Sequence, residues 1–416
     1  MSFSFSKILS KEKRGQIKEK WLFELDVNIL TPPIIADLEN KGDKDILFAT
    51  GNGKIFCLNK DAKQKWVFDA SANLSKVEQL FVDIENANSI ESTPTIIDIN
   101  GDGRKEIVFG SENGSVYALN YLGQLLWKYD VEGHIRGEVI ARDINNDGLL
   151  ELIFGSGDSH IYILRSNGQL IKKIETNVAI ESTPEIIGDK IIIGNNNGEI
   201  ICFDFEGNTI WNFKTEGKII AQPAIGNLLG DNNQFIIVGS TDQNLYALNN
   251  KGELIWKYKT NGAIYSRAVL KDINNDKRLE IIFGSCDNSI YALKSNGDKI
   301  WSYETDFWVV GPVIVADIDG DGKLEIIAGS YDHNLYILDA RGNYELDYVP
   351  GLSGIVQQTG SFSEVITSEP GTRSGKKLWQ FETEGIIVGC AVNNEERNII
   401  ISTKTGKIKG LELFER

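Results

Sequence analysis

The chain has 416 residues, a formal net charge of −16 and only four cysteines. Nucleic acids are held largely by Lys and Arg on phosphates, so this acidic balance argues against a nucleic-acid partner. The cysteines form no CxxC pair and the three histidines have no zinc-site spacing, which predicts free thiols in a reducing compartment.

The N-terminal segment differs from the rest of the chain because it is basic. Six Lys or Arg lie from Lys7 to Lys20, and we expect residues 1–17 to form an arm outside the folded domain. No apolar run is long enough for a signal peptide or a transmembrane helix. The sequence therefore predicts a cytoplasmic protein that does not contact membranes, with residues 18–416 as one domain and a monomer by itself.

One sequence pattern recurs eight times between Trp21 and the C-terminus. A full copy reads GSENGSVYALNYLGQLLWKYDVEG from Gly110, and another reads GSTDQNLYALNNKGELIWKYKTNG from Gly239. The Trp markers are often 45 residues apart, and Lys172 takes the Trp place in one copy. A fixed period near 40–50 with several short strands per unit is typical of a β-propeller.

Each unit divides into four short strands of β-branched and aromatic residues, separated by turns rich in Gly, Asn and Asp. The chain opens with a fourth strand at Trp21 and ends with a third strand from Lys407. An open ring would leave exposed strand edges at this point. We therefore predict an all-β, eight-bladed propeller of four-stranded blades, closed by the N-terminal strand joining the C-terminal blade. Each Trp is expected between neighbouring blades, beside the Gly of the preceding turn.

Four units carry the same acidic loop between their first and second strands. Asp or Asn stands at loop positions 1, 3 and 5, and Glu stands at position 9. With a main-chain carbonyl at position 7, these oxygens can surround one hard cation, and Ca²⁺ accepts six to eight such ligands. The predicted ligands are Asp98, Asn100, Asp102, Arg104 and Glu106; Asp143, Asn145, Asp147, Leu149 and Glu151; Asp272, Asn274, Asp276, Arg278 and Glu280; and Asp317, Asp319, Asp321, Lys323 and Glu325.

The alternative is that these Asp-Asn-Gly strings are simply good hairpin turns. Four copies at the same place in the unit favour metal, so the sequence predicts up to four Ca²⁺ sites. The Asp272 loop is expected to be the weakest, because Lys277 replaces the Gly that permits the sharp bend. The first unit has Lys41 at the central position, and we expect no ion there.

The repeats resemble two known propeller families. Phe109-Gly110, Phe154-Gly155 and Phe283-Gly284, together with the acidic loops, are similar to the FG-GAP calcium repeats of integrin α-subunits. The YALN…G…W segment is similar to the tryptophan-docking repeats of quinoprotein-like propellers. The resemblance implies the fold and, less directly, calcium; propellers host many activities, so it does not imply one function.

The face opposite the acidic loops should collect the connections between blades. An apolar residue recurs there in every unit, with Trp308 and Ile386 expected in this place in the last two. The residues next to this apolar position vary between units, which is typical of residues that line the central opening of a propeller and bind a ligand there. The predicted partner-binding residues are Glu91, Arg136, Glu138, Glu181, Gln222, Tyr265, Arg267 and Trp308. The alternative for each of them is a solvated loop with no ligand.

Two insertions interrupt the period. Residues 70–90 carry apolar residues at helical spacing, which predicts a helix on the mouth face. Residues 342–374 should form an extra hairpin or loop on the acidic-loop face.

Three functions remain open at this stage. The first is a non-catalytic recognition or scaffold propeller, stiffened by calcium, that binds a protein through the mouth face or the insertions. The second is a lectin-like propeller that binds carbohydrate. The third is a quinoprotein dehydrogenase, which the absence of adjacent cysteines disfavours. The sequence shows no Ser-His-Asp arrangement, so no catalytic residue is predicted.

Overall fold

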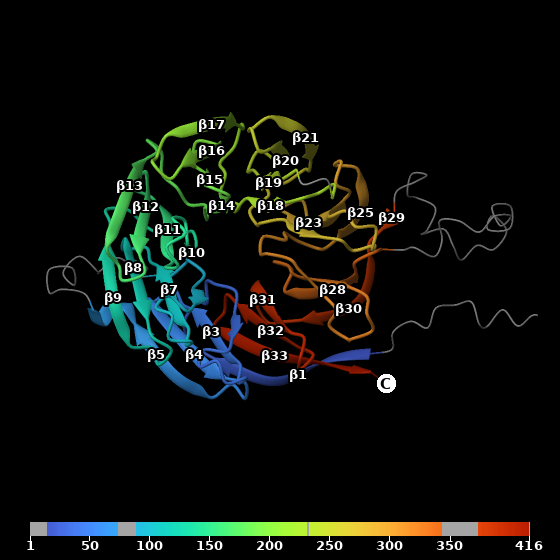
Figure 1. Cartoon of the computed structure of the whole chain (residues 1–416). Helices are drawn as coiled ribbons and strands as arrows, with labels where there is room; N and C mark the ends of the chain where they lie inside the picture. The colour runs from blue at the N-terminus through green and yellow to red at the C-terminus, as the bar shows by residue number, and fades with distance from the viewer. Residues whose placement is uncertain (1–14, 74–88, 231–232, 343–372, 416) are drawn as a thin grey trace, which may run out of the picture.

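The chain forms a ring of eight blades in a computed structural model that describes residues 15–73, 89–230, 233–342 and 373–415 (Figure 1). Each blade is an antiparallel meander whose strands run from the centre of the ring to its outside. This confirms the predicted eight-bladed propeller. No helix in these ranges is long and apolar enough to cross a membrane.

The innermost and second strands of the blades alternate along the chain. The innermost strands are β2 (Ile34–Ala36), β6 (Thr95–Ile97), β10 (Ile140–Arg142), β14 (Glu185–Ile187), β18 (Ala224–Gly226), β22 (Val269–Lys271), β26 (Ile314–Ala316) and β31 (Ile387–Asn393). The second strands are β3 (Asp45–Ala49), β7 (Glu106–Gly110), β11 (Glu151–Ser156), β15 (Lys190–Gly194), β19 (Phe235–Gly239), β23 (Glu280–Ser285), β27 (Glu325–Gly329) and β32 (Asn398–Thr403). The second strands are almost entirely buried, because neighbouring blades cover both of their faces.

The third and outermost strands complete each blade. The third strands are β4 (Lys54–Asn59), β8 (Ser115–Leu119), β12 (His160–Arg165), β16 (Glu199–Asp204), β20 (Asn244–Asn249), β24 (Ser289–Leu293), β28 (Asn334–Asp339) and β33 (Lys407–Glu415). The outermost strands are β5 (Gln64–Asp69), β9 (Leu125–Asp130), β13 (Leu170–Glu175), β17 (Thr209–Lys214), β21 (Leu254–Lys259), β25 (Lys299–Glu304), β30 (Lys376–Glu382) and β1 (Gly15–Glu24). We number the blades 1 to 8 from β2 to β31.

The ring closes where the two ends of the chain meet. Strand β1 pairs antiparallel with β33 from Gly15↔Glu415 to Glu24↔Lys407, and Figure 1 shows the blue first strand beside the red last one. Blade 8 therefore combines β31, β32 and β33 with β1. Because β1 begins at Gly15, residues 15–17 belong to the propeller and not to the predicted arm. The rest of the arm lies outside the described residues.

The repeated motifs pack the core between blades. The Phe109 and Tyr117 rings are cross-strand neighbours and stack with centroids 5.2 Å apart. A Cβ on Gly110 would lie 2.2 Å from Cγ2 of Ile135 in the next blade, so the glycine leaves room for that buried isoleucine. The Phe-Gly and Tyr-Ala-Leu motifs are thus explained by packing alone.

Each docking Trp contacts the following blade. Nε1 of Trp66 donates to the Tyr121 carbonyl at 3.1 Å, and Nε1 of Trp127 donates to the Ser166 carbonyl at 2.9 Å. The Trp66 ring lies against Gly123, whose φ is +75°. The predicted position between blades is confirmed, but the glycine beside the Trp66, Trp127, Trp211 and Trp256 rings belongs to the next blade's turn and not to the turn preceding the Trp.

The insertions are only partly described. A short 3-10 helix, η2 (Ala70–Asn73), begins the first insertion, and the predicted helix beyond it lies outside the described residues. At the end of the second insertion, β29 (Arg373–Ser374) pairs parallel with β25, which makes blade 6 five-stranded. The sequence did not predict this added strand.

Candidate metal loops and partner-binding face

The meander gives the propeller two faces with different contents. Loops between first and second strands and turns between third and fourth strands share one face, the acidic-loop face. Turns between second and third strands and the connections between blades share the other, the mouth face. All four predicted metal loops lie on the acidic-loop face, in blades 2, 3, 6 and 7.

The side-chain oxygens of the blade 2 loop accept hydrogen bonds from its own backbone. Asp98 accepts the Gly101 amide on Oδ1 at 2.7 Å and the Gly103 amide on Oδ2 at 2.8 Å. Asn100 accepts the Asp102 amide on its Oδ1 at 2.8 Å. Positions 1 and 3 are therefore fixed within one tight turn.

The position-9 glutamate closes each loop from the start of the second strand. Glu106 accepts the Ile99 amide on Oε2 and the Asn100 side-chain amide on Oε1, both at 3.0 Å. The Glu106, Glu151 and Glu280 residues are 1–2% exposed. Burial, followed by the charges of nearby Asp side chains, raises the pKa of all three, that of Glu280 to about 7. Burial therefore favours the protonated form of these carboxylates, or the charged form with a cation beside it.

The blade 6 loop keeps the same shape although it lacks the second glycine. Lys277 takes its place with φ +70° and donates its amide to Asp272 Oδ2 at 2.9 Å. A left-handed conformation at a non-glycine residue costs about 1–2 kcal/mol. The loop is thus strained, but its oxygens are arranged as in blade 2.

The blade 7 loop has the densest group of carboxylates. Asp319 stands where the other three loops have Asn, so no side-chain amide from position 3 reaches Glu325. Carboxylate oxygens of Asp317, Asp319 and Glu325 lie within 4.8 Å of one another, with Asp319 6% and Glu325 1% exposed. Of the four loops, this one has the donor set best suited to a divalent cation.

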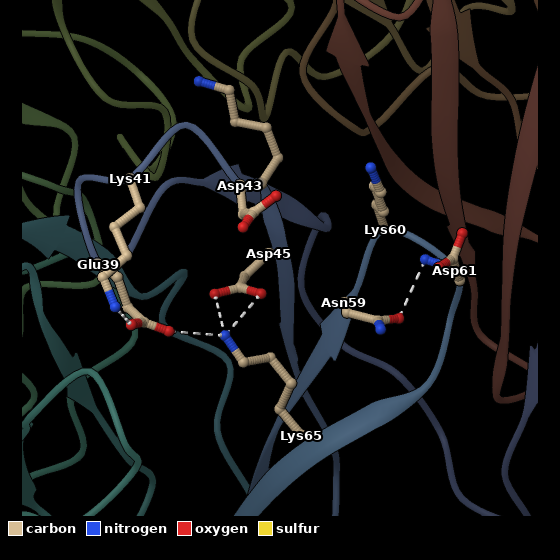
Figure 2. Close-up of a pocket in the computed structure, with 9 residues that line it drawn as sticks. Glu39, Lys41, Asp43, Asp45, Asn59, Lys60, Asp61 and Lys65 are labelled. Atoms are coloured by element: carbon tan, nitrogen blue, oxygen red, sulfur yellow. Dashed lines mark hydrogen bonds and ion pairs between the residues drawn. The ribbon is translucent and has the colours of Figure 1, made fainter.

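The corresponding loop of blade 1 carries its own counter-charge (Figure 2). Asp45, at position 9, is 3% exposed, and Nζ of Lys65 lies 2.8 and 3.1 Å from its two oxygens. Lys65 also lies 3.5 Å from Glu39, beside a cavity of about 270 Å³. In the blades with predicted metal loops, the residue before the Trp position is apolar: Leu126, Ile171, Ile300 and Leu378. Those blades have no lysine in this place.

On the mouth face, the predicted residues Glu91, Arg136 and Glu181 come from three different blades and lie together. The Arg136 guanidinium lies 3.4 Å from Glu91 and 3.3 Å from Glu181. Two further bonds, at 2.8 and 3.0 Å, reach Glu112, which the sequence analysis did not select. These carboxylates raise the Arg136 pKa, with Glu112 as the main cause. His134, Asn196 and Arg136 together lower the Glu181 pKa to about 2.

A second polar group lies at the innermost strands of blades 3 to 6. Glu185 forms an ion pair with Arg267 at 3.2 Å and accepts a hydrogen bond from Gln222 at 3.1 Å. Burial raises the Glu138 pKa, and the charge of Arg267 partly offsets this. Predicted residues Glu138, Gln222 and Arg267 thus come together around Glu185, which the sequence analysis had missed.

Aromatic side chains form a third group, beside blades 6 and 7. Tyr265, Phe307 and Trp308 are 38%, 45% and 43% exposed, and the Phe307 and Trp308 rings stack at 5.1 Å. Trp308 also lies 6.3 Å from the Tyr331 ring. We call these four residues the aromatic surface.

The recurring apolar position was misaligned by one residue in the last two blades. Val309 and Ile387, both 1% exposed, fill the place against Gly284 and Gly329 that Ile135 fills against Gly110. Trp308 stands one position earlier and is free to lie on the surface. The error arose because Trp is apolar and fits the pattern by composition.

A family model for the lambda-carrageenase beta-propeller domain matches residues 95–183, 187–255 and 249–348, together more than half of the chain. The chain belongs to this β-propeller family. The match spans the four-stranded repeats of blades 2 to 6 and the first three strands of blade 7, including all four acidic loops. It describes a different family from the integrin-type and quinoprotein-type repeats that the sequence resembles. No curated protein matches the chain.

Solved structures with this fold have very different sequences. BamB from Moraxella catarrhalis is 15% identical, with a TM-score of 0.61 over 95% of this chain and 99% of its own. The computationally designed Ika8 protein is 12% identical, with a TM-score of 0.64 over 93% and 96%. BBS1N in complex with ARL6DN is 14% identical, with a TM-score of 0.51 over 77% and 91%. At these identities the likeness concerns the fold alone.

This carrageenase-type propeller also has a repeated clasp that the sequence analysis did not single out. Asp287 accepts the Tyr291 hydroxyl at 2.8 Å and the Asn261 amide at 2.9 Å, both on Oδ2. Asp242 and Asp332 make equivalent bonds in blades 5 and 7. The sequence could have predicted this contact, because in each of these three blades an Asp stands four residues before the Tyr of the third strand. The clasp ties each mouth-face turn to the preceding connection.

Proposed function

We propose that this protein is a non-catalytic recognition propeller, stabilised by calcium, which binds a protein partner through its mouth face. The observation that supports it most is the composition of that face. Exposed Trp, Tyr and Arg side chains are enriched at the centres of protein interfaces. Here Trp308, Tyr265 and Arg136 lie on one surface of a rigid ring. A propeller of the same fold, BBS1N, was crystallised in complex with ARL6DN.

Calcium is proposed from the comparison between blades. Each loop places a buried carboxylate at position 9, and in blade 1 the ammonium of Lys65 neutralises it. Blades 2, 3, 6 and 7 have Leu or Ile in the lysine's place. A cation from solution would supply the missing charge, and Ca²⁺ suits the oxygen ligands and the flexible loop. The calcium would stiffen the acidic-loop face and leave the mouth face free.

The partner proposal is tested with a matched pair of variants. Trp308→Ala removes an exposed apolar side chain from the mouth face, and Leu229→Ala removes one of similar exposure (42%) from the acidic-loop face. Proteins crosslinked to wild type and to both variants are quantified by mass spectrometry. A specific partner is lost with Trp308→Ala and kept with Leu229→Ala. Equal recovery with both variants would contradict binding at the mouth.

The calcium proposal has an independent test. Ca²⁺ that binds only the folded protein stabilises it by about 2.7 kcal/mol at a hundredfold excess over Kd. Thermal unfolding is compared with Ca²⁺ and with a chelator, in wild type and in Asp317→Asn. We expect a higher Tm with Ca²⁺ and a smaller rise in the variant. An unchanged Tm on chelation would remove the metal from the proposal.

Carbohydrate is the second candidate ligand. The aromatic surface could stack against sugar rings, and the family's name refers to a sulfated galactan. The net charge of −16 and the glutamates of the mouth face oppose a polyanion. Titration with lambda-carrageenan and with neutral galactan oligosaccharides distinguishes these ligands. Binding that Trp308→Ala abolishes would favour the carbohydrate reading.

A further inference from the structure

The mouth face contains polar atoms that are buried and have no hydrogen-bond partner among the described residues. Ser266 is 8% exposed and lies between Tyr265 and Arg267, yet its Oγ has none. In blades 2 and 4, the equivalent Ser92 and Ser182 donate to backbone carbonyls at 2.9 and 3.0 Å. Buried polar atoms without a partner are rare in native proteins, so this one calls for an explanation.

One more such atom lies beside Glu181. The Asn196 side chain donates to Glu181 Oε1 at 2.9 Å, but its own Oδ1 is buried and has no hydrogen-bond partner among the described residues. His134 Nε2 lies 3.6 Å from Glu181 Oε1, beyond hydrogen-bond distance, and the protonated imidazole would form an ion pair with Glu181. The Asn196 acceptor flanks the Arg136 group and can receive another hydrogen-bond donor.

The charges of the same group are unbalanced. Glu91, Glu112 and Glu181 surround a single guanidinium, that of Arg136. Glu112 and Glu181 are well buried, with side chains 16% and 14% exposed, whereas the Glu91 side chain is 43% exposed. A carboxylate thus remains accessible at the edge of a negatively charged group. The group lacks a second cation that can donate hydrogen bonds to this carboxylate.

The geometry points to an arginine-bearing segment of the partner as the ligand of the mouth face, with its guanidinium at Glu91 in blade 2 and apolar side chains that reach the aromatic surface of blades 6 and 7 across the ring. This inference rests on the proposed function, because it names the chemistry of the proposed protein partner. Carboxylates and an amide oxygen require donors, and a guanidinium carries five donors in a planar fork. Arginine also stacks well on aromatic rings, which a compact ammonium does less well.

The arrangement disfavours other ligands. A sulfated glycan would bring negative charge to a surface where Glu91, Glu138 and Glu181 already stand. A neutral glycan would leave the charge of the Glu91 group unbalanced. An acidic peptide would be repelled in the same way. An arginine-bearing segment satisfies both the carboxylate group and the aromatic surface.

The test uses a short fluorescein-labelled peptide that repeats Gly-Arg-Phe, with Gly-Lys-Phe and Gly-Glu-Phe repeats as matched probes. Binding to the full chain is followed by fluorescence anisotropy at several salt concentrations. Glu91→Gln and Trp308→Ala are compared with Glu206→Gln and Leu229→Ala, which change exposed residues on the acidic-loop face. Lambda-carrageenan and a neutral galactan oligosaccharide serve as competitors.

We expect the arginine peptide to bind most tightly and the glutamate peptide not at all. Glu91→Gln should weaken binding about tenfold, and Trp308→Ala about thirtyfold, while both control variants behave as wild type. Binding should also weaken as salt rises. Equal binding of the arginine and glutamate peptides, or equal effects of Glu91→Gln and Glu206→Gln, would overturn the inference.

The outcome can be separated from that of the proposed function. A protein partner that depends on Trp308 but is insensitive to Glu91→Gln and to salt would overturn the arginine inference and keep the protein-binding function. Displacement of the peptide by a glycan at lower concentration, with the same dependence on Trp308, would overturn both.

Discussion

The Lys65 ammonium lies 2.8 Å from Oδ2 of Asp45, and blades 2, 3, 6 and 7 have Leu or Ile at the position of this lysine. Burial raises the Asp45 pKa, and Lys65 opposes this by hydrogen bonding and by its charge. The pair shows how this fold can neutralise a position-9 carboxylate with a side chain. It also provides an internal standard against which the metal loops can be tested.

Replacing Lys65 with leucine should destabilise the protein by about 1–3 kcal/mol. Loss of one partner leaves a buried carboxylate unpaired, which costs about 3–5 kcal/mol in a fully buried pair, and the partial exposure of Lys65 reduces this. The loss should shrink at low pH, because protonated Asp45 no longer needs the cation. Urea unfolding at two pH values measures this. Lys60→Leu, in the same cavity, should change stability little, and an equal loss there would contradict the argument.

Calcium binding should release protons near neutral pH. Burial raises the Glu280 pKa from 4.5 to about 7, so the metal-free protein binds this proton more tightly than the unfolded chain does. Its stability should therefore fall as pH rises from about 5 to 7, and Ca²⁺ should remove that loss by taking the proton's place.

Calorimetry in buffers of different ionisation enthalpy measures the proton release directly. Glu280→Gln should reduce the number of protons released. Asp298→Asn, at an exposed turn on the same face, should leave it unchanged. Calcium binding with no buffer dependence in wild type would show that Glu280 is not a ligand.

Much of the fold could be predicted because the repeated sequence pattern determines the strands of each blade. The Trp spacing predicts the blades, and the fourth-strand pattern at Trp21 predicts the closure that the β1–β33 pairing confirms. The acidic loops were also predictable as loops, since the side chains of Asp98, Asn100 and Glu106 form their hydrogen bonds within nine residues of sequence. Local patterns of this kind do not depend on how the ring is assembled.

Contacts between strands that are not adjacent, and contacts between blades, could not be predicted in the same way. Lys65 meets Asp45 across a strand that lies between them, and Arg136 meets Glu112 from the neighbouring blade. Neither pair has a sequence spacing that repeats in the other units. The added strand β29 follows an insertion with no counterpart in the repeat. These features depend on which irregular side chains the ring brings together.

Closure of the ring should be sensitive to one glycine. Gly410 pairs with Trp21 across the β1–β33 ladder, and a Cβ there would lie 2.2 Å from Cε2 of Trp21. Gly410→Ala should destabilise the protein by about 1–3 kcal/mol, because the indole must move. Gly51→Ala is the matched control, since its Cβ would meet nothing closer than 3.5 Å.

Limited proteolysis locates the effect. Strand β1 should be cut earlier in Gly410→Ala than in wild type, while cleavage elsewhere is unchanged. Equal protection of β1 in both proteins would mean that the closing strand is held independently of the Trp21–Gly410 contact.

A fifth metal loop should be obtainable in blade 1. The loop already has the required shape, because Asp37 accepts the Lys41 amide at 3.0 Å on Oδ1 and the Gly42 amide on Oδ2 at 2.6 Å. The blade 1 loop differs from the blade 2 loop in its ligand residues and in Lys65, whose ammonium stands where the cation would bind. The combined variant E39N, K41D, D45E and K65L supplies the ligands of the blade 2 loop and removes the competing ammonium.

This variant should bind one more Ca²⁺ than wild type, as measured by isothermal titration calorimetry. K65L alone should add no site, because Lys41 still stands at the central position. The variant should be less stable than wild type in chelator and should recover in Ca²⁺, since the metal then supplies the charge that Lys65 gave. If the fourfold variant binds no additional ion while the natural loops do, then the shape of the loop and its oxygens are not sufficient. Ligation would then depend on features of the natural loops that the fourfold variant does not reproduce.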